Sequence, residues 1–179
     1  MAFAHDTNEA LRAAVTLVNS AGPPDTLEST ESLSNFLDDF QYTGRRDGDR
    51  AELEAVRRSR ARLRALLTAD RDHAVELLNE MLRSARAVPQ LRRHSGYDWH
   101  IHAVDDDSPL RDRILVETAM AMIDVVRADE MSRLSVCADA ECDGLVLDLS
   151  RNRSRKFCST ACTNRNAVAA YRARQASGD

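Results

Sequence analysis

Residues 137–162 read CADAECDGLVLDLSRNRSRKFCSTAC and contain all four cysteines of the 179-residue chain. Four residues separate Cys137 from Cys142, three separate Cys158 from Cys162, and fifteen lie between the two pairs. A zinc ion bound by four thiolates at about 2.3 Å brings the sulfur atoms within roughly 4 Å of one another, so each pair must come from one tight turn or one helical turn. Both spacings meet this condition. The stretch therefore predicts one structural zinc ion bound by Cys137, Cys142, Cys158 and Cys162.

The residues between the pairs predict how the chain returns to the metal. Asp143-Gly144 favours a turn after the first pair, and residues 145–149 alternate as in a strand. A helix that starts near Ser159 would place the second pair one turn apart. So small a module buries too little apolar area to fold by burial alone, and metal binding would supply the missing stability.

Other uses of the cysteines are disfavoured by the rest of the chain. The first ten residues lack the pattern of a signal peptide, and no apolar run approaches the roughly 18 residues of a membrane span. We therefore expect a cytoplasmic protein with no membrane partner, in which disulfides are rare. A redox switch that uses the same thiolates remains open. Four thiolates leave no coordination position for substrate, so we expect a structural ion and no enzyme.

Helical periodicity dominates the sequence before the cysteines. Ser108 is the expected N-cap of the last long helix, with Pro109 at its first position, and the two strands would turn around Ser95-Gly96. We predict a mainly α fold: a helical sensor or interaction domain over residues 1–132 with a short β-hairpin, a zinc-finger module over 133–175, and a frayed tail over 176–179. The predicted helices cover residues 7–19, 32–41, 49–67, 70–86 and 109–131.

Two polar features of the helical part have structural interpretations. Five arginines between residues 57 and 64 predict a solvated helix face, with Glu54 as the i,i+4 partner of Arg58. His100 and His102 share one face of a predicted strand but lack a third convergent ligand, so we do not assign them to a metal.

Positive charge is concentrated at the cysteine end of the chain. Residues 1–136 hold 24 acidic and 18 basic residues, whereas residues 151–174 hold seven basic and no acidic ones. This pattern favours a nucleic-acid surface in which Arg and Lys meet phosphates and Arg or Asn reaches base edges. An acidic protein, or the chain's own acidic body, is the alternative partner. The candidate nucleic-acid residues are Arg151, Arg153, Arg155, Lys156, Asn164, Arg165, Arg172 and Arg174.

Several short motifs resemble known families. The cysteine region resembles the CGNR zinc-finger family, whose signature tetrapeptide contains the last ligand. The resemblance lies in Asp148, Ser150 and Asn152, in RKFC at 155–158 and in CTNR at 162–165. LVNS at 17–20 and the helical body to about residue 130 resemble the domain described as a putative stress-induced transcription regulator. The two resemblances imply a bacterial DNA-binding transcription regulator with the four cysteines as zinc ligands.

The resemblance also implies that Asn164 and Arg165 matter. The family's glycine is Thr163 here, and we expect a helical conformation there, which a β-branched residue tolerates. Arg165 either contacts DNA or stabilises the module through a pair with Asp148; we favour the second. The short basic segment covers few phosphates, so we expect a homodimer. An unknown small-molecule effector would act on the helical domain. The alternatives are a zinc-stabilised protein–protein interaction module and, less favoured, an enzyme or small-molecule sink with a pocket in the helical domain.

Overall fold

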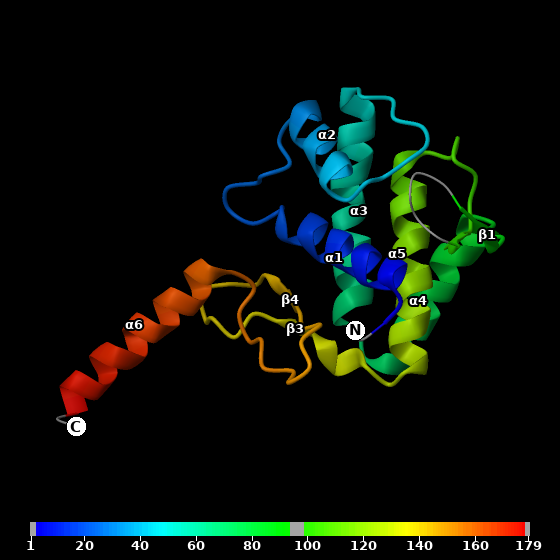
Figure 1. Cartoon of the computed structure of the whole chain (residues 1–179). Helices are drawn as coiled ribbons and strands as arrows, with labels where there is room; N and C mark the ends of the chain where they lie inside the picture. Colours follow the sequence, from blue (N-terminus) through cyan, green and yellow to red (C-terminus); the bar gives the residue numbers. More distant parts are fainter. Residues whose placement is uncertain (1–2, 94–98, 178–179) are drawn as a thin grey trace.

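The computed structural model describes residues 3–93 and 99–177, which contain six α-helices, one 3₁₀ helix and four short strands (Figure 1). The predicted mainly α fold with a hairpin and a separate cysteine cluster is confirmed. The elements in chain order are α1 (His5–Asn19), α2 (Thr30–Asp39), α3 (Arg50–Thr68), α4 (Arg71–Ser84), β1 (Gln90–Arg92), β2 (His100–His102), α5 (Leu110–Arg127), η1 (Met131–Arg133), β3 (Leu134–Val136), β4 (Leu145–Leu147) and α6 (Thr160–Ser177).

Side-chain caps fix where three helices of the helical body begin. The Asp49 carboxylate accepts from the backbone N–H of Glu52, and the Asp70 carboxylate accepts from that of His73. Ser29 and Ser32 form a reciprocal capping box at α2. Each cap satisfies a backbone donor that has no partner within its helix. The cap predicted at Asp70 is therefore confirmed.

Three helices end earlier than their apolar periodicity predicts. α2 ends at Asp39, before Gln41, which adopts a left-handed φ of 52°. α4 ends at Ser84 because Arg86 adopts a left-handed φ of 51°, and α5 ends at Arg127 because Asp129 adopts a φ of 56°. After α5, the Glu130 N–H donates to the Val125 carbonyl at 2.9 Å, which closes a Schellman turn. The predicted ends at residues 41, 86 and 131 were wrong for this reason.

The predicted start of α5 was also wrong by one residue. Pro109, not Ser108, is the N-cap, and the helix begins at Leu110 without a side-chain cap. The pattern located the helix, but the proline ψ of 136° keeps Pro109 outside it.

α5 is the central helix of the fold, as its wide apolar circumference predicts. It packs against α1, α3 and α4, and Ile114, Ala119 and Met122 are fully buried. Burial of such side chains stabilises a fold by roughly 1.5–3 kcal/mol each. The shared core also includes Leu145 and Leu147 from β4.

The strands form two antiparallel pairs. β1 pairs with β2 with Leu91 opposite Ile101, which confirms the predicted hairpin; the turn predicted at residues 95–96 lies outside the described residues. β3 pairs with β4 with Leu134 opposite Leu147. The sequence predicted β4 but not β3, whose three residues are too short for a periodic signal.

The cysteine region is joined to the helical body. The side chain of Asn19, at the end of α1, accepts from the Leu145 N–H at 2.6 Å and donates to the Leu145 carbonyl at 2.9 Å. These two hydrogen bonds attach the end of α1 to the backbone of β4. The boundary at residues 132/133 stays a prediction. Among the described residues, no helix is both long and apolar enough to span a membrane.

The arginine run of α3 is only in part the solvated face that the sequence predicts: Arg58 and Arg62 are exposed, but Arg60 is buried. The Arg60 side chain is 7% exposed, and it shares the carboxylate of Asp25 with Arg57 at 3.1 and 3.0 Å. Glu54 lies 3.6 Å from Arg57, so the expected pairing with Arg58 is replaced by an i,i+3 contact. Arg57 and Arg60 thus close the loop after α1, whereas Arg64 donates to the Asp143 carbonyl of the cysteine region at 2.6 Å.

Candidate metal centre and basic surface

The first cysteine pair lies in a knuckle loop between β3 and β4. Backbone bonds close the loop: the Cys137 N–H donates to the Gly144 carbonyl at 2.8 Å, and the Cys142 N–H donates to the Asp139 carbonyl at 2.9 Å. The Ala138 N–H donates to the Lys156 carbonyl at 2.9 Å, which ties the knuckle to the returning chain. The antiparallel pairing of β3 with β4 thus fixes both ends of the loop.

The second pair lies at the start of α6. Ser159 caps this helix, because its Oγ accepts from the Cys162 N–H at 3.2 Å. Cys158 precedes the first turn and Cys162 lies within it. The N-terminus of α6, the positive end of its dipole, therefore lies at the second cysteine pair.

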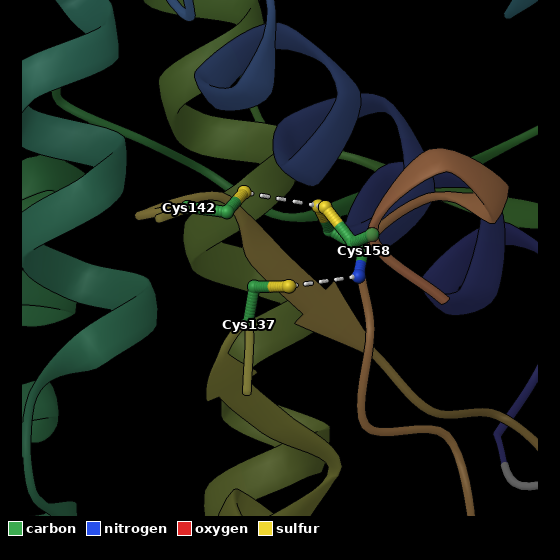
Figure 2. Close-up of side chains that lie close together, drawn as sticks. Cys137, Cys142 and Cys158 are labelled. Carbon is green, nitrogen blue, oxygen red and sulfur yellow. Dashed lines mark hydrogen bonds between the residues drawn. The ribbon is translucent and has the colours of Figure 1, made fainter. Parts of the chain in front are cut away.

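The four sulfur atoms converge on one point; Figure 2 shows three of them, those of Cys137, Cys142 and Cys158. All of them lie within 4.8 Å of one another; Cys142 and Cys158 are 3.5 Å apart, and Cys158 and Cys162 are 3.7 Å apart, measured between Sγ atoms. A tetrahedral zinc site with bonds of about 2.3 Å has sulfur atoms roughly 3.8 Å apart. All four cysteines are free of disulfides. The predicted cluster is confirmed as a set positioned to bind one metal ion.

The surroundings of the cluster fit an ion at its centre. The Gly144 N–H donates to Cys142 Sγ and the Cys158 N–H to Cys137 Sγ, both at 3.4 Å. A Cβ on Gly144 would lie 2.9 Å from Cys158 Sγ and 3.3 Å from Cys142 Sγ, so only glycine leaves room for the sulfur atoms. Burial, together with the neighbouring thiols, raises the pKa of Cys158 to about 12. A cation at the centre would offset the repulsion between neighbouring thiolates. A bound zinc ion would thereby hold the knuckle loop against α6.

Arg165 connects the two halves of the centre. Its Nε lies 2.7 Å from Asp139 Oδ2 in the knuckle, and its Nη2 donates to Cys162 Sγ at 3.5 Å. Desolvation would raise the pKa of Asp139, but the bonds from Arg165 and the Glu141 N–H lower it on balance. The expected Arg165–Asp148 pair was wrong: Asp148 instead accepts from the backbone N–H groups of Ser150 and Arg155, at 2.8 and 2.7 Å.

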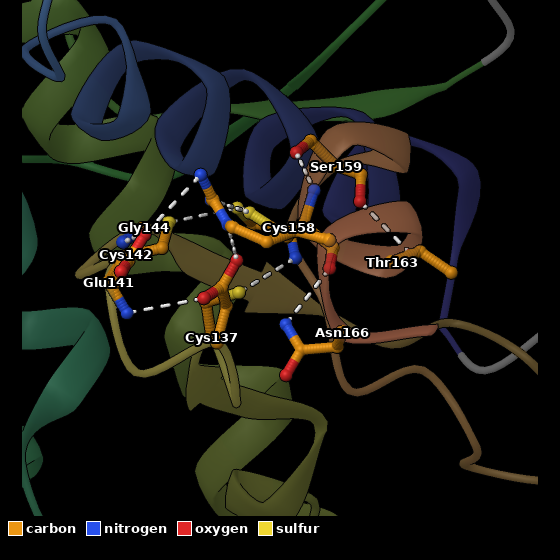
Figure 3. A network of polar contacts seen from close by, with 11 residues as sticks. Cys137, Glu141, Cys142, Gly144, Cys158, Ser159, Thr163 and Asn166 are labelled. Carbon is orange, nitrogen blue, oxygen red and sulfur yellow. Dashed lines mark hydrogen bonds and ion pairs between the residues drawn. The ribbon is translucent and has the colours of Figure 1, made fainter. Parts of the chain in front are cut away.

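The residues around the signature tetrapeptide are helical (Figure 3). Thr163 lies within α6 and its Oγ1 donates to the Ser159 carbonyl at 3.1 Å, so the predicted helical conformation is confirmed. Asn166 donates to the Cys162 carbonyl at 3.0 Å. Asn164 is exposed on the surface of the helix. Threonine at position 163 is therefore compatible with the metal cluster.

Among the eight candidate nucleic-acid residues, Arg153, Arg155 and Arg165 bond to atoms of the cysteine region or of the helical body. Besides Arg165, Arg153 lies 2.7 Å from Glu130, and Arg155 donates to the carbonyls of Phe157 and Cys158 at 3.2 and 3.0 Å. Arg153 therefore forms an ion pair with the acidic helical part of the chain. The others are exposed, and α6 extends away from the helical body (Figure 1). These others are Arg151, Lys156, Asn164, Arg172 and Arg174.

Sequence reasoning missed one residue that supports the module. Arg133 is 8% exposed, lies 2.9 Å from Glu130, and donates to the carbonyls of Asp148 and Ser150 at 2.9 and 3.1 Å. It holds the chain after β4 against η1. A single arginine next to an unrecognised strand gives no local signal, so only the fold could identify it.

Both parts of the chain match models of known protein families. The model of the ABATE domain, described as a putative stress-induced transcription regulator, matches residues 11–129. The chain belongs to this family. The model of the CGNR zinc finger matches residues 133–175, which contain the whole cysteine cluster. An ABATE domain followed by a CGNR zinc finger confirms both resemblances seen in the sequence. No curated protein matches the chain.

Proposed function

We propose that this ABATE protein is a DNA-binding transcription regulator of the cytoplasm, in which one structural zinc ion holds a basic module in place for DNA. The supporting observation is the exposed basic helix α6 together with the loop before it, a segment with no acidic residue from 151 to 178. A merely solvated surface mixes both signs of charge. Four thiolates fill the metal coordination, which supports a structural ion and no catalysis.

The geometry supports docking along α6. The helix has 18 residues, about 27 Å in length, and the metal cluster fixes its first turn. A major groove about 12 Å wide admits an α-helix. We propose that Arg172 and Arg174 contact phosphates on the far part of the helix. Arg151 and Lys156 would do so on the loop, and Asn164 would lie nearest to base edges.

The contacts within the protein change which substitutions test DNA binding best. Arg155 and Arg165 bond the zinc module itself, so their removal would disturb the fold as well as any interaction with DNA. Arg172 is exposed near the C-terminal end of α6, far along the helix from the metal cluster. Its substitution therefore removes a charge at little structural cost.

Fluorescence anisotropy with labelled random-sequence duplex DNA tests the proposal. We expect affinity to fall steeply between about 50 and about 200 mM salt, and the slope to shrink by about 0.9 for each arginine that no longer neutralises a phosphate. The variant Arg172→Gln should flatten the slope. Arg58→Gln, an exposed arginine of α3, is the charge-matched control and should not. No binding near about 100 mM salt, or equal slopes for all three proteins, would refute the proposal.

A zinc-stabilised protein interaction module is the second candidate, because α6 also exposes apolar side chains. Val168 and Tyr171 are 48% and 58% exposed and lie one turn apart on this helix. The expected homodimer would bury them. Analytical ultracentrifugation should show a dimer that Val168→Ser/Tyr171→Ser dissociates. A monomer at every concentration, with and without DNA, excludes the homodimer.

A further inference from the structure

A cavity of about 330 Å³ lies in the ABATE domain, away from the cysteine cluster. Its walls come from α1, from α5, from β2 and from the residues that follow α2. Such a volume is at the lower end of the range of small-molecule sites in proteins, roughly 300–1,000 Å³. The apolar part of the wall includes Ala10, Phe40, Met120 and Ile123, which suits a small apolar or aromatic body.

The charged side chains of the wall are mostly acidic. Asp6, Glu9, Glu117 and Asp124 line the cavity, and Arg127 is the one Lys or Arg among the described lining residues. Such a wall attracts a cation and repels an anion. A ligand carboxylate or phosphate would meet four carboxylates and a single guanidinium.

The two histidines of β2 do not reverse this balance. The Nε2 atoms of His100 and His102 are 2.9 Å apart. One of these nitrogens must accept the hydrogen bond, so both rings cannot be fully protonated in this arrangement. His102 Nδ1 also lies 3.7 Å from an Asp106 carboxylate oxygen, outside the cavity wall. The pair therefore adds at most one positive charge to the wall.

Two carboxylates of α5, those of Asp124 and Glu117, line the cavity and differ in their surroundings. Asp124 accepts a hydrogen bond from the Thr7 hydroxyl at 2.6 Å. Glu117 is half-buried beside the buried Tyr42, and desolvation raises its pKa to about 7 against the opposing effects of Arg113 and of a hydrogen bond from Tyr42. Arg113 is one turn away, but its guanidinium donates to the backbone carbonyls of Thr43, Arg45 and Ser108. Desolvation outweighs the attraction of Arg113, so the negative charge of Glu117 is incompletely compensated, and a cationic ligand would stabilise its ionised form.

We propose that this cavity binds a small organic amine in its cationic form, with the ammonium group on Glu117 and an aromatic or aliphatic body against the apolar wall. The proposal rests on the proposed function, because it gives the ABATE domain the effector that a regulator would sense. It also goes further, since it names the chemical class of that effector. Charge-assisted hydrogen bonds from the ammonium group to Glu117 would provide orientation and specificity.

Isothermal titration calorimetry of the zinc-loaded full chain at about pH 8, where Glu117 is ionised, tests the proposal. The probes are phenethylamine, phenethyl alcohol and hydrocinnamate, which share one ring and differ in charge. We expect the amine to bind at least about tenfold more tightly than the alcohol, since hydrogen bonds between charged groups are the strong ones. Hydrocinnamate should not bind. Equal or tighter binding of hydrocinnamate, or no binding of any probe, would overturn the proposal.

Two variants locate the effect in the cavity. Glu117→Gln should remove the preference for the amine over the alcohol, and Ala10→Phe should abolish binding of both by filling the space. Glu31→Gln, an exposed carboxylate of α2 outside the cavity, is the charge-matched control and should behave as wild type. An unchanged preference in Glu117→Gln contradicts the proposal, and circular dichroism checks that each variant is folded. The titration contains no DNA and the anisotropy assay contains no amine, so failure of either proposal is seen separately.

Discussion

Replacing Gly144 with alanine adds one carbon atom next to the cysteine sulfur atoms and so tests how closely they are packed around the metal. The added Cβ would lie 2.9 Å from Cys158 Sγ and 3.3 Å from Cys142 Sγ, whereas non-bonded heavy atoms rest at about 3.5–4.0 Å. Without metal, the Cys158 side chain can rotate away from the new methyl group. With zinc bound, the sulfur is fixed at the bond length, so the overlap weakens metal binding.

The expected size of this effect follows from the overlap. Overpacking of a well-filled site costs about 1–3 kcal/mol, which corresponds to roughly a 5- to 150-fold loss of zinc affinity. Competition with a chromophoric zinc chelator measures it. Gly48→Ala is the matched control: Gly48 has a φ of 66° and no atom within 4 Å of its added Cβ, so alanine costs about 1 kcal/mol of folding free energy there but leaves zinc affinity unchanged. A Gly144→Ala protein that holds zinc within twofold of wild type would refute the packing argument.

Further outcomes follow from other interactions. Native mass spectrometry should find one zinc ion per chain and none in Cys158→Ser. Arg165→Ala should lower zinc affinity by roughly 10- to 100-fold, as removal of a residue that orients ligands does, and Arg165→Lys should recover part of it in the same chelator assay. Asp25→Asn should lower the free energy of unfolding by about 1–3 kcal/mol in urea titrations, because the buried Arg60 loses its carboxylate. The raised pKa of Glu117 stabilises the fold fully below about pH 4.5, and this contribution disappears as pH rises through about 7; Glu117→Gln should therefore gain up to about 3 kcal/mol relative to wild type between pH 5 and pH 8.

The groups around Glu117 set this pH dependence. Tyr42 donates a hydrogen bond to the carboxylate and Arg113 attracts it, which both lower its pKa, whereas Asp106 and above all desolvation raise it. The net result is a carboxyl that keeps its proton in the folded state over a range where the unfolded chain has lost it. A difference between Glu117→Gln and wild type that stays the same at both pH values would contradict this assignment.

Much of the fold could be predicted because its signals are local. Helical periodicity located the first five helices, and the cap at Asp70 follows from one residue and its place before an apolar stripe. Helix ends were less predictable. The left-handed residues that close α4 and α5 are an arginine and an aspartate, and neither marks a helix end as glycine would.

The metal ligands could be predicted because the spacing of four cysteines is itself a geometric constraint. The residues that support these ligands could not be predicted. Asp139 and Asp148 are both acids near the metal, and only the folded knuckle shows that Arg165 reaches Asp139, 26 positions away. Asn19 likewise meets Leu145 across 126 positions. Such contacts depend on how the β3–β4 pair sits on α1, which local patterns do not encode.

Selection of binding sites from random duplex DNA tests the central claim most directly, namely that a zinc-held basic module reads DNA. The zinc-loaded protein should enrich one sequence motif at about 100 mM salt, and Cys158→Ser should enrich none because its module cannot hold the metal. No enriched motif for the zinc-loaded protein, or the same motif for Cys158→Ser, would contradict the claim.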